Sequence, residues 1–89
     1  MGAVAEAIRR KLAASFAPRR LEVIDESARH AGHAGARPGG ETHFRVEIVA
    51  AAFAGLSRLE RQRRVNAALA DELAGPVHAL SIRAAAPDE

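Results

Sequence analysis

The first third of the chain shows two hydrophobic patterns in succession. Apolar residues recur at every fourth position near the N-terminus, at Val4, Ile8, Leu12 and Phe16. This spacing predicts an amphipathic helix, and Pro18 ends it because proline cannot continue a helix. Leu21, Val23 and Ile24 follow with polar residues between and after them, and they predict a short first strand.

The middle of the chain predicts a second strand and a second helix. Residues 42–48 alternate strictly, with one face formed by Thr42, Phe44, Val46 and Ile48 and the other by His43, Arg45 and Glu47. Phe53 is expected to be a buried anchor in the turn that follows. Ser57 and Glu60 have the spacing of a capping box, so a helix begins there and ends at Gly75-Pro76. Its apolar face comprises Val65, Ala68, Leu69 and Leu73.

The last strand is expected within Val77–Ala84, with His78, Leu80 and Ile82 on one face. The order is therefore helix, strand, strand, helix, strand, which predicts a two-layer α+β sandwich with both helices on one face of a three-stranded mixed sheet. The first two strands should pair antiparallel, and the third is expected beside the first. We expect a single domain over residues 1–89, with its core at about residues 4–86.

Residues 27–40 interrupt this pattern. The segment contains four Gly, one Pro and no large aliphatic residue, so it predicts a loop. It is longer than an ordinary hairpin connection of about two to five residues. We therefore expect it to be functional and to be the most mobile part of the chain.

The amino-acid composition excludes several classes of function. The 89 residues are 48% hydrophobic and 27% charged with a net charge of +2, which fits a small globular domain. An aromatic content of 3% argues against base stacking on exposed rings. The absence of Cys excludes disulfides, thiol catalysis and clusters held by the chain's own thiolates. No apolar run has the length of a membrane span or a signal peptide, so we expect a cytoplasmic protein without a membrane partner.

Histidines are the candidate metal ligands. His30 and His33 lie in the glycine-rich loop, where the ordinary interpretation is a solvated side chain. His78 stands at the entrance to the last strand and is either a half-buried, hydrogen-bonded histidine or a ligand at the edge of the sheet. No arrangement of Ser, His and Asp predicts nucleophilic catalysis, and we expect no enzymatic activity.

Arginines of the second helix are the candidate nucleic-acid contacts. Arg58, Arg61, Arg63 and Arg64 either form a solvated helix face or contact a DNA backbone. In the second case Arg61, Arg63 and Arg64 are candidates for phosphate contacts, and Asn66 is a candidate for reading a base edge.

Several segments together resemble the BolA family. They are LEVIDES, GGETHFRV, FAGLSRLERQRRVNAALADEL and VHALSI, in the family's order and spanning residues 8–87. The resemblance implies a class II KH-like fold. It also implies a monothiol glutaredoxin partner, which with glutathione holds a bridging 2Fe–2S cluster, and a role in iron–sulfur and iron homeostasis and in stress response.

The resemblance also implies site residues. One cluster ligand would be His78, and the second would come from the loop, where this chain offers His30 or His33 and no Cys. The isolated chain would then hold no cluster, and a monomer is favoured. Some family members are described as transcriptional regulators that bind promoter DNA through the helix and the last strand, which implies DNA contacts at Arg63, Arg64 and Asn66. Gln62 stands where the family usually has His. A third possibility is a protein partner bound without metal.

Overall fold

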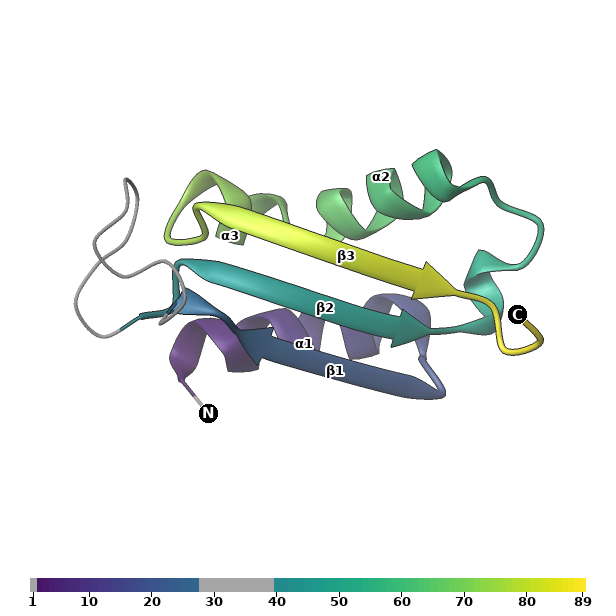
Figure 1. Cartoon of the computed structure of the whole chain (residues 1–89), viewed down its shortest axis with the longest axis horizontal. Coiled ribbons are helices and arrows are strands. Elements are labelled where there is room, and N and C mark those ends of the chain that lie inside the picture. The colour runs from purple at the N-terminus through teal and green to yellow at the C-terminus, as the bar shows by residue number, and fades with distance from the viewer. Residues whose placement is uncertain (1, 28–39) are drawn as a thin grey trace.

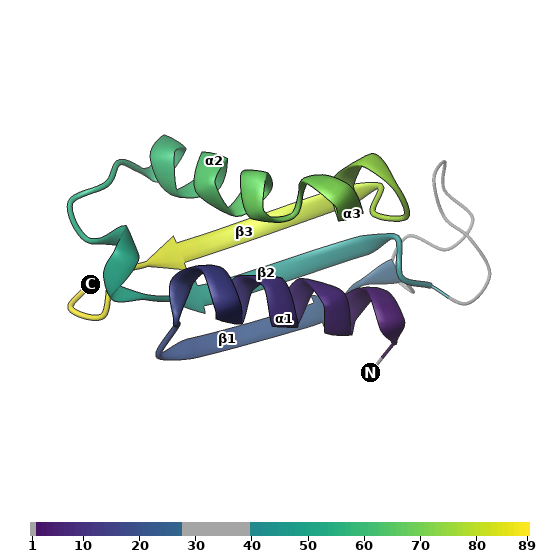
Figure 2. The ribbon, with the colours of Figure 1, turned by 180° about the vertical axis from the view of Figure 1, so that it is seen from behind.

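A three-stranded sheet carries the helices on one of its faces, which confirms the predicted α+β architecture (Figures 1 and 2). The computed structural model describes residues 2–27 and 40–89. Its elements are α1 (Ala3–Phe16), β1 (Arg20–Asp25), β2 (His43–Val49), the 3-10 helix η2 (Ala51–Phe53), α2 (Arg58–Ala68), α3 (Ala70–Ala74) and β3 (Ala79–Ala85).

Helix α1 lies against the sheet with the apolar stripe that its spacing predicts. Ile8 and Leu12 are fully buried, and Phe16 packs on the buried ring of Phe53 with the ring centroids 4.9 Å apart. The helix ends at Ala17, which has a left-handed backbone (φ 46°) and is followed by Pro18. The prediction that Phe53 anchors the turn is confirmed.

Strand β2 occupies the centre of the sheet. Its predicted alternation is confirmed from Phe44 to Ile48, since Phe44, Val46 and Ile48 are buried whereas Arg45 is exposed, but His43 at its start is buried as well. β1 pairs with β2 antiparallel, as predicted. The expected place of the third strand was wrong, because β3 pairs parallel with β2 and not with β1.

The correction has a physical reason in the burial of the strands. β2 contributes fully buried residues to the core, whereas every apolar residue of β1 is only half-buried, as suits the edge of a sheet. A helix that connects β2 to a parallel neighbour also needs only short links to reach the adjacent position.

The second helix begins as predicted but does not run without interruption to Gly75. Ser57 Oγ accepts a hydrogen bond from the Glu60 backbone N–H at 3.1 Å, which confirms the N-cap. Leu69 then leaves helical geometry (φ −106°, ψ 22°) and separates α2 from α3. Neither Gly nor Pro marks this break in the sequence, and Leu69 itself is 1% exposed.

The predicted loop 27–40 is described only at its two ends. Ser27 and Gly40 lie in the described part of the chain, and residues 28–39 lie outside it. The predicted mobility of the loop therefore stays a prediction.

Candidate functional site

His78 lies immediately before β3, at the end of the sheet where β2 also begins (Figure 1). Gly75-Pro76 ends α3, and Val77 is buried and fixes the approach to the strand. The backbone N–H groups of His78 and Ala79 both donate to the carbonyl oxygen of Thr42, at 2.7 and 3.1 Å. The side chain of His78 is exposed on a backbone that the central strand holds in place.

The sequence placed His78 on the same face as Leu80 and Ile82, and this expectation needs correction. β3 begins at Ala79, and His78 forms a bend before it. Leu80 and Ile82 are half-buried against the core, whereas His78 is exposed. Of the two interpretations left open by the sequence, the half-buried histidine therefore does not apply.

A second histidine, His43, lies beside His78. Their ring centroids are 5.3 Å apart, and the rings are inclined at 50°. His43 is only 6% exposed, although the alternation of β2 placed it with Arg45 and Glu47 on the outer face. Its Nδ1 lies 2.8 Å from Thr42 Oγ1, which fixes the orientation of the ring.

The sequence did not single out His43 as part of a site. Its proximity to His78 arises from the parallel register, in which His43 is paired with Ala79. Because the sequence predicted β3 beside β1, it could not predict that His43 and His78 lie side by side.

Hydrogen bonds join the residues that follow β1 to the residues that precede β2. Ser27 Oγ accepts from the backbone N–H groups of Thr42 at 2.9 Å and His43 at 3.2 Å. The Asp25 carboxylate accepts from the N–H groups of Ser27 at 2.9 Å and Glu41 at 3.1 Å. Partial burial would raise the pKa of Asp25, but the hydrogen bonds from Ser27 and Glu41 outweigh it and lower that pKa.

The other predicted ligands, His30 and His33, lie outside the described residues. The flanking residues of their segment meet β2 at Thr42 and His43, next to His78. Within residues 2–27 and 40–89 there is no group of three or more His, Asp or Glu side chains able to hold a metal ion. The described residues thus offer the exposed imidazole of His78 with His43 beside it.

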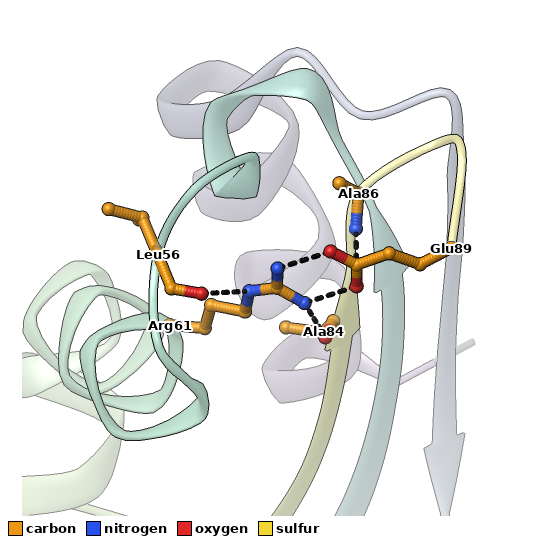
Figure 3. Close-up of polar contacts among 5 residues, drawn as sticks. All are labelled: Leu56, Arg61, Ala84, Ala86 and Glu89. Carbon is orange, nitrogen blue, oxygen red and sulfur yellow. Dashed lines mark hydrogen bonds and ion pairs between the residues drawn. The ribbon is translucent and has the colours of Figure 1, made fainter.

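Arg61, the first of the predicted DNA contacts, is engaged inside the protein (Figure 3). Its guanidinium forms a bidentate ion pair with Glu89 and donates to the carbonyl oxygens of Leu56 at 3.1 Å and Ala84 at 3.2 Å. Its side chain is only 12% exposed. Arg61 therefore fastens α2 to the end of β3.

The remaining DNA candidates lie on the exposed part of α2. Arg63, Arg64 and Asn66 are all exposed, and Arg63 lies 3.8 Å from the carboxylate of Glu60. Arg63, Arg64 and Asn66 are therefore exposed on α2, whereas the guanidinium of Arg61 on the same helix is paired with Glu89.

A family profile and individual protein sequences match this chain over most of its length. The family profile described as BolA-like protein matches residues 12–89. The chain is 53% identical over 87 residues to human BolA-like protein 1, covering 98% of this chain and 61% of that protein. It is 44% identical over 79 residues to the DNA-binding transcriptional regulator BolA of Vibrio cholerae, covering 89% and 71%. The chain thus spans about three-fifths of the length of its mammalian relatives.

Solved structures agree with this match. The BolA domain of SufE1 from Arabidopsis thaliana has a TM-score of 0.90 at 44% identity, covering 99% of this chain and 96% of that one. BolA1 from Mus musculus has a TM-score of 0.84 at 50% identity, covering 99% and 68%. Within the described residues, no helix has the length and apolar character needed to cross a bilayer.

Proposed function

Because this chain belongs to the BolA-like protein family, we propose that it is a non-enzymatic adaptor that binds a monothiol glutaredoxin and lends histidine ligands to a shared 2Fe–2S cluster. The observation that carries the proposal is the exposed imidazole of His78, whose backbone is held at the end of the sheet by the carbonyl oxygen of Thr42. His30 and His33, which precede Thr42 in the sequence, are the candidates for the second ligand.

The donor set of this chain fits a shared cluster better than one of its own. The chain has no Cys, so its ligands to iron would be imidazoles. No three metal-ligating side chains meet within the described residues, so the partner and its glutathione would have to supply the thiolates. A cluster held there would supply one-electron chemistry and an iron–sulfur unit for transfer in iron homeostasis.

The protein's own part would be to present His78 in a fixed position. The two N–H groups that donate to the Thr42 carbonyl oxygen fix the backbone on either side of the His78 Cα atom. The neighbouring His43 is oriented by Thr42 Oγ1 and borders one side of the His78 ring. His43 is thus a positioning residue, because side chains that are held by packing and hydrogen bonds present a ligand with less loss of freedom.

A titration tests the cluster proposal. Cluster-loaded monothiol glutaredoxin is mixed with this protein, and visible circular dichroism is followed. We expect a new spectrum with the wild type, its loss with His78→Ala, and its loss with either His30→Ala or His33→Ala, whichever removes the second ligand. Arg9→Ala, an exposed change on α1, should leave the new spectrum intact.

Binding of cluster-free glutaredoxin is measured in parallel by calorimetry. If His78→Ala binds cluster-free partner as the wild type does, loss of the spectrum reports lost ligation and not lost association. A wild-type mixture whose spectrum equals that of glutaredoxin alone would refute the cluster proposal.

DNA binding is the second candidate function. The exposed group Arg63, Arg64 and Asn66 favours it, together with the relative from Vibrio cholerae that is named a DNA-binding transcriptional regulator. On this proposal α2 enters a groove, the two arginines contact phosphates, and Asn66 reads a base edge.

Salt dependence distinguishes these contacts. Arg63→Ala and Arg64→Ala should each weaken promoter binding and lower the slope of log affinity against log salt by about one unit. Arg61→Ala should leave that slope unchanged, because its guanidinium is already paired with Glu89. Slopes that do not change in Arg63→Ala and Arg64→Ala would contradict a DNA role for α2.

A further inference from the structure

β3 presents an unpaired backbone edge. The N–H of Ala79 and the carbonyl of Ala85 point toward β2, where they bond Thr42 O and Ala50 N. The carbonyl of Ala84 points the opposite way, to Arg61. Because backbone groups alternate sides along a strand, those of Leu80 and Ile82 also point away from β2. In the part of the chain that the structure describes, no strand lies on that side.

Helix α2 borders this edge and makes it a groove. A hollow of about 550 Å³ extends along β3 and is lined by α2, by β3 and by the outer face of β2. Arg58, Arg61 and Gln62 line it from the helix, and Ser81 and Arg83 line it from the strand. A groove between a helix and the free edge of a strand is a geometry that can take an extended peptide as an added strand.

The side chains that line the groove carry more positive than negative charge. Four arginines and one carboxylate, Glu47, line it, and one of the arginines, Arg61, is paired with Glu89. Arg45 lies near Glu26 and Glu47, at 3.4 and 3.7 Å. Arg58 and Arg83 are exposed, and neither forms an ion pair within residues 2–27 and 40–89. The groove therefore has two cations available to a partner.

The chain's own Glu89 indicates what such a partner carries. Its carboxylate pairs through both oxygens with Arg61, which is one of the residues that line the groove. The Ala86 N–H donates to the same carboxylate at 3.3 Å. An arginine and a backbone amide thus bind the acidic side chain of Glu89. An acidic peptide beside β3 would meet the same two kinds of group, an arginine side chain and backbone N–H groups.

We infer that the groove between α2 and β3 binds an extended acidic peptide segment of a partner protein, which adds to β3 as a fourth strand. The backbone of Leu80 and Ile82 forms the ladder. Peptide residues on the outer face are acidic and pair with Arg83, and those on the inner face are small and apolar and pack between Ile82 and α2. Neither the cluster proposal nor the DNA proposal is needed for this binding.

The probe is a fluorescent heptapeptide that alternates Glu and Val, and the protein is the full chain without glutaredoxin. We expect saturable binding, with the largest amide shifts in nitrogen–proton NMR spectra at Leu80 and Ile82 and slower hydrogen exchange there. Arg83→Ser should weaken binding about tenfold, since a charge-assisted hydrogen bond is lost. Arg9→Ser, an exposed change on α1, is the matched control and should bind as the wild type does.

Two further peptides separate a ladder from charge attraction. One has Lys in place of Glu, and the other keeps every Glu but is N-methylated on the edge that faces β3. Both should bind at least about tenfold more weakly, because one loses the charge and the other loses the backbone bonds. Equal binding of the N-methylated peptide would overturn the inference. A DNA duplex that shifts Leu80 and Ile82 while the acidic peptide does not would also overturn it.

Discussion

Single residues distant in sequence complete the ends of the secondary structure. Helix α1 has Gly2 at its N-cap and no side chain of its own that caps it. Glu41 takes this role, since its Oε2 accepts from the backbone N–H of Ala5 at 2.9 Å. A carboxylate at this position satisfies an otherwise unpaired N–H and interacts favourably with the helix dipole. The return of the chain into β2 is therefore linked to the start of α1.

This capping predicts the effect of Glu41→Ala. The free energy of unfolding should fall by about 1 kcal/mol, the usual cost of losing an N-cap. Urea unfolding followed by far-ultraviolet circular dichroism measures it. Glu6→Ala, an exposed carboxylate in the first turn of α1, is the matched comparison and should cost less because it accepts no such bond within the described residues. Equal losses in the two variants would contradict a capping role.

The ion pair between Glu89 and Arg61 predicts how the stability of the fold depends on pH. The hydrogen-bonded ion pair with Arg61 lowers the pKa of Glu89 from 4.5 to about 2. Because the folded pKa lies below the unfolded one, this pair stabilises the fold above about pH 4.5 and the contribution is lost as pH falls toward 2. Carbon-detected NMR should show the Glu89 carboxyl titrating near pH 2, and near its ordinary pKa in Arg61→Gln. An unshifted midpoint in the wild type would show that the pair does not form in solution.

At the scale of elements, one lysine of α1 pairs with two carboxylates of α3. Lys11 Nζ lies 2.8 Å from Glu72 and 3.4 Å from Asp71. The Glu72 side chain is only 10% exposed, whereas that of Asp71 is 91% exposed. The hydrogen bond with Glu72 raises the pKa of Lys11. The break at Leu69 thus gives α3 a position from which a mostly buried carboxylate can meet α1.

The pair predicts an asymmetric mutational pattern. Lys11→Met should lower the urea midpoint more than Asp71→Asn does, because it leaves the carboxylate of Glu72 buried without its cation. The double variant Lys11→Met/Glu72→Leu should recover part of the loss, since two apolar side chains can replace a buried ion pair. A double variant less stable than Lys11→Met alone would contradict this explanation.

For the whole molecule, the sequence predicted those features that depend on local patterns. The alternation of β2, the stripe of α1 and the Ser57 cap are confirmed because each is set by neighbours along the chain. The place of β3 was wrong because strand order depends on how α2 and α3 cross the sheet. The break at Leu69 was missed because it follows from packing, with no Gly or Pro to mark it.

The candidate site shows the same division between local and tertiary information. His78 could be predicted as a candidate ligand because it follows the end of a helix at Gly75-Pro76. Its exposure could not be predicted, because it depends on β3 beginning only at Ala79. His43 could not be selected, because only the pairing of β2 with β3 brings it to His78. The sequence did not distinguish Arg61 from Arg63, because the partner of Arg61, Glu89, is 28 residues away in the chain.

The hydrogen bonds between the residues that flank segment 28–39 leave that segment open to replacement. Asp25, Ser27 and Glu41 complete their bonds to the sheet and to α1 on the near side of it. His78 is held by Thr42, which lies outside it. A shorter, longer or chemically different stretch could therefore be grafted between Ser27 and Gly40 without refolding the scaffold. If the cluster proposal holds, the segment that contains His30 and His33 could then be redesigned while His78 keeps its backbone contacts.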